Sequence, residues 1–130
     1  MAAKKEIKNK FNSKYLKRIG LVFIVVIIAT LIDWITHSSN PSFYVPFEYY
    51  HNKVVFAFLW GFVALWLARN VKSMTKKAFI FSAVIALVLQ TKYFFQGYDL
   101  YFVFLFMFLH FGMFLVPALI LFNKYKKIFT

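Results

Sequence analysis

The sequence of 130 residues lacks cysteine altogether and contains only four acidic residues, against 16 lysines and arginines. The absence of cysteine excludes disulfides, thiolate metal sites and cysteine nucleophiles. The sequence also lacks glycine-rich phosphate-binding loops, the Gly-x-Ser-x-Gly nucleophile motif and the His-Glu-x-x-His zinc motif. These absences disfavour an enzyme. No cofactor is predicted from motifs, and only a metal ion is kept as an alternative below.

Apolar residues are in large excess, because 62% of the chain is hydrophobic and 23% is aromatic. A soluble domain is roughly 45–50% apolar, so the excess is expected to face lipid. A helix crosses a bilayer with about 20 apolar residues and satisfies its own backbone hydrogen bonds there. We therefore predict an all-α, polytopic membrane protein with four transmembrane helices, at about residues 19–36, 53–69, 77–95 and 100–122. The first run could instead be the apolar part of a signal peptide, although its cleavage pattern is poor.

Basic residues flank these apolar runs unevenly. They gather in an arm at residues 1–18, between the second and third runs, and in a tail at residues 124–130. Only Lys53 and Lys92 lie at the opposite ends of the runs, together with three of the four acids. Lysine and arginine near span ends are retained in the cytoplasm, so we expect an N-in/C-in protein of a prokaryotic cell membrane. The net charge of +12 then needs no nucleic acid, and the basic termini are expected to contact anionic lipid headgroups.

Small residues form a stripe on two of the predicted spans. Helices in lipid pack most closely where small side chains let their backbones approach. We expect the second and third spans to pack together through these positions. The stripes consist of Ala57, Gly61, Ala64 and Ala68 on the second span and of Ala78, Ser82 and Ala86 on the third.

Polar groups within or beside the spans are few, and they lie on the predicted outer side or near mid-span. They are Asp33, His37, Gln90, Lys92, Asp99 and His110. Ionisable groups in a span are functional candidates by default. One interpretation is structural, with Asp33 paired to Lys92 and His110 bonded across helices. Another is a solute or proton path through Asp33 or His110, since the ordinary histidine pKa of roughly 6.5 is close to physiological pH.

A metal site is the third interpretation of the polar groups. Asp33 and His37 are four residues apart, so they share one helix face. Glu48 and His51 have the Glu-x-x-His spacing, which di-iron bundles use twice and this chain has once. Asp33, His37, Glu48 and His51 together would offer oxygen and nitrogen ligands at one membrane face.

Three functions remain open from the sequence. The leading hypothesis is a non-catalytic integral membrane subunit that assembles with other membrane proteins or with copies of itself, because its polar groups are sparse. The second is a small oligomeric channel or transporter for an ion or small solute, because four helices alone seldom enclose a conduit. The third is a membrane-embedded metal-dependent enzyme that uses the outer-face Asp/His/Glu cluster.

Overall fold

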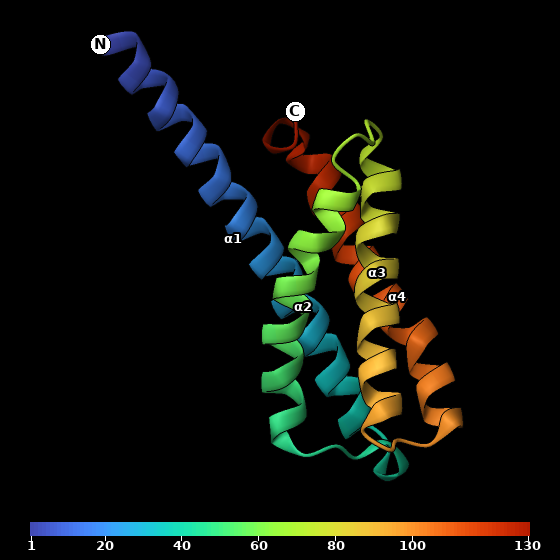
Figure 1. The fold of residues 1–130 in the computed structure, drawn as a ribbon. Helices are drawn as coiled ribbons and strands as arrows, with labels where there is room; N and C mark the ends of the chain where they lie inside the picture. The colour runs from blue at the N-terminus through green and yellow to red at the C-terminus, as the bar shows by residue number, and fades with distance from the viewer.

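The computed structural model describes residues 1–130 as a bundle of four helices (Figure 1). All four helices are long and apolar enough to cross a membrane, so the prediction of four such helices is confirmed. Two short 3-10 turns complete the secondary structure. The elements are α1 (Ala2–Ser38), η1 (Pro41–Phe43), α2 (Phe47–Leu67), α3 (Met74–Phe95), α4 (Leu100–Lys124) and η2 (Lys126–Ile128).

The helices form a ring in which each packs against two neighbours. α1 contacts α2 and α4, and α3 contacts the same two helices from the other side. Both termini lie at one end of the bundle, which we call the terminal end (Figure 1). The α1–α2 and α3–α4 connections lie at the opposite end, which we call the distal end. The first half of α1 projects beyond the bundle as a continuous helix, so the predicted basic arm is helical.

Three of the helices begin earlier than the predicted spans, and α1 does so because the basic arm belongs to the same helix. α2 starts at Phe47 rather than at residue 53, and α3 starts at Met74 rather than at residue 77. Pro46 precedes the first turn of α2, which tolerates a proline there because those N–H groups have no helical partner. The earlier start places Tyr49 and Lys53 one turn apart on the buried face of α2.

The turn between α3 and α4 is fixed by a glycine. Gly97 has φ of 86°, a left-handed conformation that costs glycine little. Its N–H donates to the carbonyl of Phe94 at 3.1 Å, and the N–H of Tyr98 donates to the carbonyl of Tyr93 at 3.2 Å. This pair of bonds is the Schellman helix ending. The turn thereby places Tyr98 beside Tyr93 at the distal end.

The small-residue stripes are buried where α2 meets α3 and α1. Ala57, Ala64 and Ala78 have no exposed surface. A methyl group added at Gly61 would lie 3.0 Å from the Phe81 ring and 3.1 Å from Val22. α2 therefore approaches both neighbouring helices at Gly61, in the manner expected of helices that pack without a hydrophobic driving force.

The bundle has apolar side chains outside and several polar side chains inside. Large aromatic and aliphatic groups such as Phe108 and Ile120 are exposed. Polar or charged groups are buried at eight positions, namely Thr30, Asp33, His37, Lys53, Lys77, Ser82, Gln90 and His110. Five of them gather in one place, which we describe next.

Candidate metal centre

An ion pair between α1 and α2 lies at the centre of the buried polar groups. The Lys53 Nζ is 2.7 Å from the Asp33 Oδ2, and both side chains are fully buried. Asp33 is on the distal half of α1, and Lys53 is on the second turn of α2. Removing one partner of such a pair typically costs about 3–5 kcal/mol, because the other charge is left buried and unpaired. The pair therefore ties α1 to α2.

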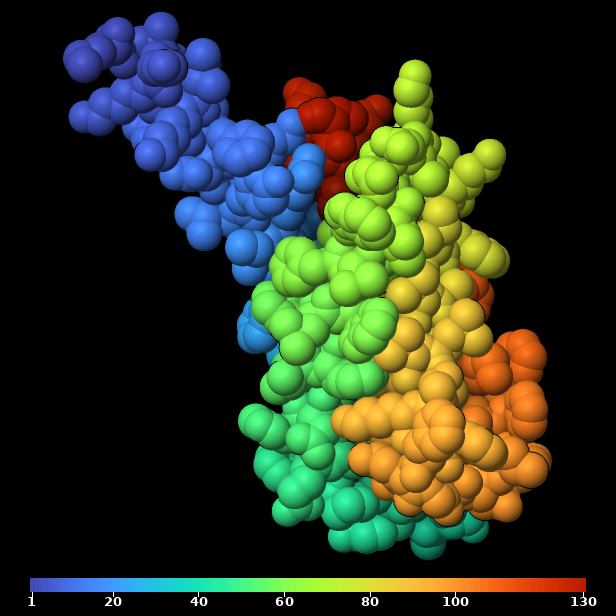
Figure 2. Space-filling view, viewed as in Figure 1, coloured from blue at the N-terminus to red at the C-terminus, as the bar shows by residue number.

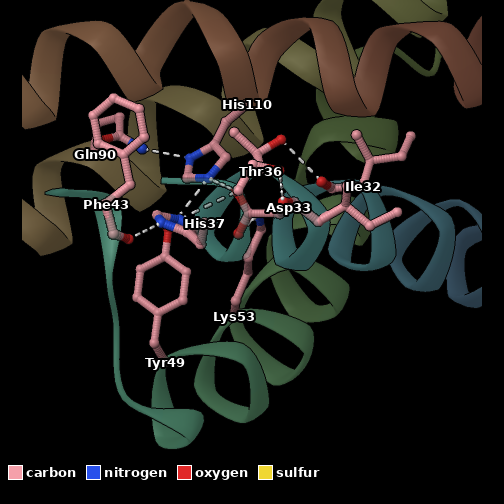
Figure 3. A network of polar contacts seen from close by, with 11 residues as sticks. Ile32, Asp33, Thr36, His37, Phe43, Tyr49, Lys53, Gln90 and His110 are labelled. Atoms are coloured by element: carbon pink, nitrogen blue, oxygen red, sulfur yellow. Dashed lines mark hydrogen bonds and ion pairs between the residues drawn. The ribbon is translucent and has the colours of Figure 1, made fainter. Parts of the chain in front are cut away.

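Two histidines approach the other oxygen of the same carboxylate (Figure 3). The His110 Nε2 is 3.0 Å from the Asp33 Oδ1, and the His37 Nε2 is 3.4 Å from it. His37 lies one turn after Asp33 on α1, whereas His110 comes from α4. The four-residue spacing on α1 thus explains the contact of His37 with Asp33, and the packing of α1 against α4 produces the contact of His110.

Tyr49 of α2 adds a fourth polar atom to the cluster. Its hydroxyl oxygen is 3.3 Å from the Nε2 of His37 and 3.3 Å from the Nε2 of His110. One carboxylate oxygen, two imidazole nitrogens and one phenol oxygen, from three helices, therefore form a closed ring of contacts. We call Asp33, His37, Tyr49 and His110 the buried cluster.

The other ring nitrogen of each histidine, Nδ1, also has a hydrogen-bond partner. The His37 Nδ1 is 2.5 Å from the carbonyl oxygen of Phe43, so it must donate, because a carbonyl only accepts. The His110 Nδ1 is 2.5 Å from the Gln90 side-chain amide. That amide fills nearly the same space in either orientation, and turned by 180° its oxygen accepts from Nδ1–H. In both rings Nε2 can then present a lone pair to the cluster.

The spacing of neighbouring cluster atoms suits the ligands of a four-coordinate metal ion. Zinc binds nitrogen and oxygen ligands at roughly 2.0–2.1 Å, which separates neighbouring tetrahedral ligands by roughly 3.3–3.4 Å. The four contacts above run from 3.0 to 3.4 Å. The ligand atoms of Asp33, His37 and His110 all lie within 4.8 Å of one another. A metal-binding histidine usually donates its other N–H to a carbonyl or a similar acceptor, as His37 does here.

The same atoms also close a hydrogen-bonded network around protons alone. The Nε2–H of His110 can donate to Asp33, and the Tyr49 hydroxyl can donate to His37. In that state the Gln90 amide nitrogen donates to the His110 Nδ1, and the Gln90 Oε1 has no partner. A metal ion would displace the Tyr49 hydroxyl proton, and the His110 proton would move from Nε2 to Nδ1, where the turned Gln90 amide accepts it.

Glu48 and His51 do not join Asp33 and His37. Both side chains are exposed, although the sequence grouped them with that pair. The reason is the early start of α2, which turns Tyr49 and Lys53 toward the core and directs the residues beside them outward. The structure thus brings His110 and Tyr49 to the pair in place of Glu48 and His51.

Lys92 and Asp99 also lie outside the buried cluster. The Lys92 ammonium lies over the Phe56 ring, 4.7 Å from its centre, so the expected pair with Asp33 is replaced by the pair with Lys53. Asp99 is exposed and precedes the first turn of α4. Gln90 is the other predicted polar residue that the structure brings to the cluster, through its contact with His110.

A cavity at the distal end reaches the cluster through Tyr49. Its volume is about 390 Å³, and Tyr49, Tyr93 and Tyr98 are among its lining residues. The Tyr49 and Tyr93 rings stack with centroids 4.8 Å apart. Toward the terminal end, by contrast, the core beyond the cluster consists of side chains such as Val25 and Phe114. Access to the cluster is therefore from the distal end.

The sequence matches no protein-family model and no curated protein, and the fold matches no solved structure.

Proposed function

We propose that this chain is an integral membrane protein that binds a divalent transition-metal ion in the distal half of its bundle. Asp33, His37, His110 and Tyr49 are the ligands. The observation that carries the proposal is that four ligand-type atoms from three helices form a closed ring of neighbouring contacts of 3.0 to 3.4 Å, the separation expected between ligands of one metal ion. A membrane-buried cluster of this kind is costly unless its groups are paired or ligated.

The proposed orientation has both termini in the cytoplasm and the distal end outside. The terminal end carries the basic arm, the α2–α3 connection with the first turn of α3, and the basic tail, which together hold all but two of the 16 lysines and arginines. Of those two, Lys53 is buried against Asp33. The positive-inside rule therefore favours this orientation, and the exposed apolar helix faces are suited to lipid.

A closed, non-catalytic site is the form of metal centre that the geometry favours. Catalytic zinc sites keep one open position for water or substrate, whereas structural sites fill all four with protein ligands. Tyr49 occupies the fourth corner here and separates the cluster from the distal cavity. This form agrees with the non-catalytic membrane subunit expected from the sequence, whose partners stay a prediction.

A channel or transporter receives less support from the arrangement. Conduction or alternating access needs polar groups on both sides of a central site. Here the buried polar groups between the cluster and the terminal end reduce to Thr30, Ser82 and Lys77, with Phe81 and Phe122 among the fully buried side chains. A solute that reached the cluster from the distal end would therefore find no polar path onward to the terminal end.

Lys53 shapes the charge of the proposed site. Its ammonium neutralises Asp33 through Oδ2 and leaves Oδ1 free for the metal ion. A divalent ion beside this neutral pair would carry excess positive charge in a medium of low dielectric constant. That excess favours an anionic fourth ligand, which Tyr49 supplies when its hydroxyl proton is displaced.

Metal content of the purified protein tests the proposal. The protein is extracted in a mild detergent, exposed to zinc or cobalt, desalted and analysed by mass spectrometry of the metal. We expect about one ion per chain, and a cobalt spectrum with the intense visible bands of tetrahedral coordination. His110→Gln should abolish binding, whereas His51→Gln should retain it, because His51 is exposed and outside the cluster. Substoichiometric metal in the wild type, or equal loss in both variants, rejects the proposal.

A further inference from the structure

A second cavity lies at the terminal end, where α1 leaves the bundle. It occupies about 310 Å³ between α1, the end of α2, the start of α3 and the C-terminal turn. In Figure 2 the C-terminal turn is visible between the projecting half of α1 and the end of α2. A volume of this size is at the lower limit of small-ligand pockets, roughly 300–1,000 Å³.

Three cations line this cavity, and none has an acidic partner. They are Arg18 of α1, Arg69 after α2 and Lys77 of α3. The ion pairs of the chain involve Glu6 and Asp33 only, and no acid lines the cavity. Like charges gathered without a counter-charge repel one another, so an anion bound among them would lower their energy.

Lys77 is the cation of this set whose burial most favours an anionic partner. Its side chain is buried, with a residue exposure of 4%. Lysine is almost never buried to this degree unless it is paired. Its Nζ donates to the carbonyl of Ala68 at 2.8 Å, which leaves further donors of the ammonium group without a partner.

Both arginines line the cavity, and a backbone carbonyl fixes each guanidinium. The Arg18 Nε donates to the Ile128 carbonyl at 2.7 Å, and the Arg69 Nη1 donates to the Trp66 carbonyl at 3.0 Å. The Arg69 guanidinium lies over the Trp66 ring, 4.5 Å from its centre. Arg18 lies within 6 Å of the Phe129 ring centre, at 5.9 Å. Each guanidinium has five donors, so most remain free in a preorganised site.

We infer that the cavity lined by Arg18, Arg69 and Lys77 binds a phosphate group, carried by an anionic lipid headgroup or by a soluble phosphate compound. Phosphate matches the site in charge, because it can carry two negative charges against three positive ones. Guanidinium groups bind phosphate oxygens in a bidentate manner, which gives the arginines their geometric role. In the proposed membrane orientation the cavity lies at the cytoplasmic headgroup level, where basic pockets between helices bind such lipids.

The test compares two double variants of the full-length protein with the same net charge. Arg18→Gln/Arg69→Gln removes two cations from the cavity, and Lys8→Gln/Lys124→Gln removes two exposed cations from the same end. Lys77 is left intact because it is buried. Binding of phosphatidate, phosphatidylcholine and inorganic phosphate is measured in mixed micelles, by native mass spectrometry and by the ligand-dependent rise in Tm.

A phosphate site predicts saturable binding that weakens by roughly tenfold or more for each guanidinium removed, because hydrogen bonds to charged groups are strong. The control variant should bind within about threefold of the wild type, because its lysines are outside the cavity. Binding of phosphatidate alone assigns the site to lipid, and competition by inorganic phosphate assigns it to a soluble compound. Both outcomes support the inference.

Equal weakening in the two double variants would overturn the inference, because general attraction to the basic end predicts the same loss for the same charge. Failure of all three ligands to saturate would overturn it as well. Both double variants should keep the gel-filtration profile of the wild type. The buried cluster is untouched in them, so their zinc content separates a failure here from a failure of the proposed metal site.

Discussion

Lys53 of α2 and Asp33 of α1 form an ion pair of 2.7 Å in which neither side chain is exposed. The ammonium compensates the charge of the Asp33 carboxylate and occupies one of its two oxygens. It also links the two helices at the level of the histidines. Most of the measurable consequences of the proposed site depend on this contact.

Lys53→Met should lower the free energy of unfolding by about 3–5 kcal/mol, because it leaves a buried carboxylate without its counter-charge. Asp33→Asn/Lys53→Met, which removes both charges, should be more stable than Lys53→Met alone. Denaturant unfolding in a fixed detergent measures both. Lys76→Met, at an exposed position of α3, is the control and should change stability by less than about 0.5 kcal/mol. A double variant as unstable as the sum of its two single variants would contradict the pairing.

Gly61→Ala should destabilise the bundle by about 1–3 kcal/mol, because the new methyl group would meet Phe81 at 3.0 Å and Val22 at 3.1 Å. Gly112 of α4 is the matched control, since a methyl group there meets nothing within 4 Å. Gly112→Ala should be neutral, or stabilising by up to about 1 kcal/mol through its greater helix propensity. Thermal unfolding of the two variants side by side checks the difference. Equal stability of the two would show that α2 is not closely packed at this point.

Metal binding should release one proton, because the ion displaces the hydroxyl proton of Tyr49, whereas the Nε2 proton of His110 moves to Nδ1 and stays on the ring. Affinity should therefore rise with pH, by about tenfold per pH unit for each proton released. Calorimetry in buffers of different ionisation enthalpy counts the protons directly. Tyr49→Phe should bind more weakly and release one proton fewer. A wild type that binds metal without any release would contradict the assigned ligands.

The proposed orientation can be checked with single cysteines, because the chain has none of its own. Ser42→Cys, at the exposed distal end, should react with a membrane-impermeant maleimide in intact cells. Lys8→Cys and Lys127→Cys should react only after the cells are permeabilised. Labelling of the two terminal positions in sealed cells would refute the N-in/C-in arrangement.

The helical architecture was accessible from the sequence because composition and apolar run length determine it. The buried cluster was accessible only in part. The four-residue spacing placed Asp33 and His37 on one face, and His110 was identified as a mid-span polar group. Lys53 and Tyr49 were missed because the apolar run begins after them, at Val54.

The buried positions of α2 nevertheless follow a pattern that extends N-terminal to the apolar run and includes Tyr49 and Lys53. Tyr49, Lys53, Ala57, Gly61 and Ala64 recur every three or four residues and form one buried stripe. Extending the small-residue stripe toward the N-terminus would have placed Tyr49 and Lys53 on the face that meets α1 and α3. Which lysine pairs with Asp33 depends on how the helices are rotated against one another. Local sequence patterns do not fix that rotation, so Lys92 was chosen instead of Lys53.

The unbroken course of α1 has a mechanical consequence. A single helix runs from Ala2 to Ser38, so the projecting basic segment and the Asp33 carboxylate belong to one continuous rigid element. Between these two segments, α1 approaches α2 closely where Val22 packs against Gly61. A protein or lipid surface that tilts the projecting end of α1 would shift Asp33 and His37 together, while His110 stays with α4.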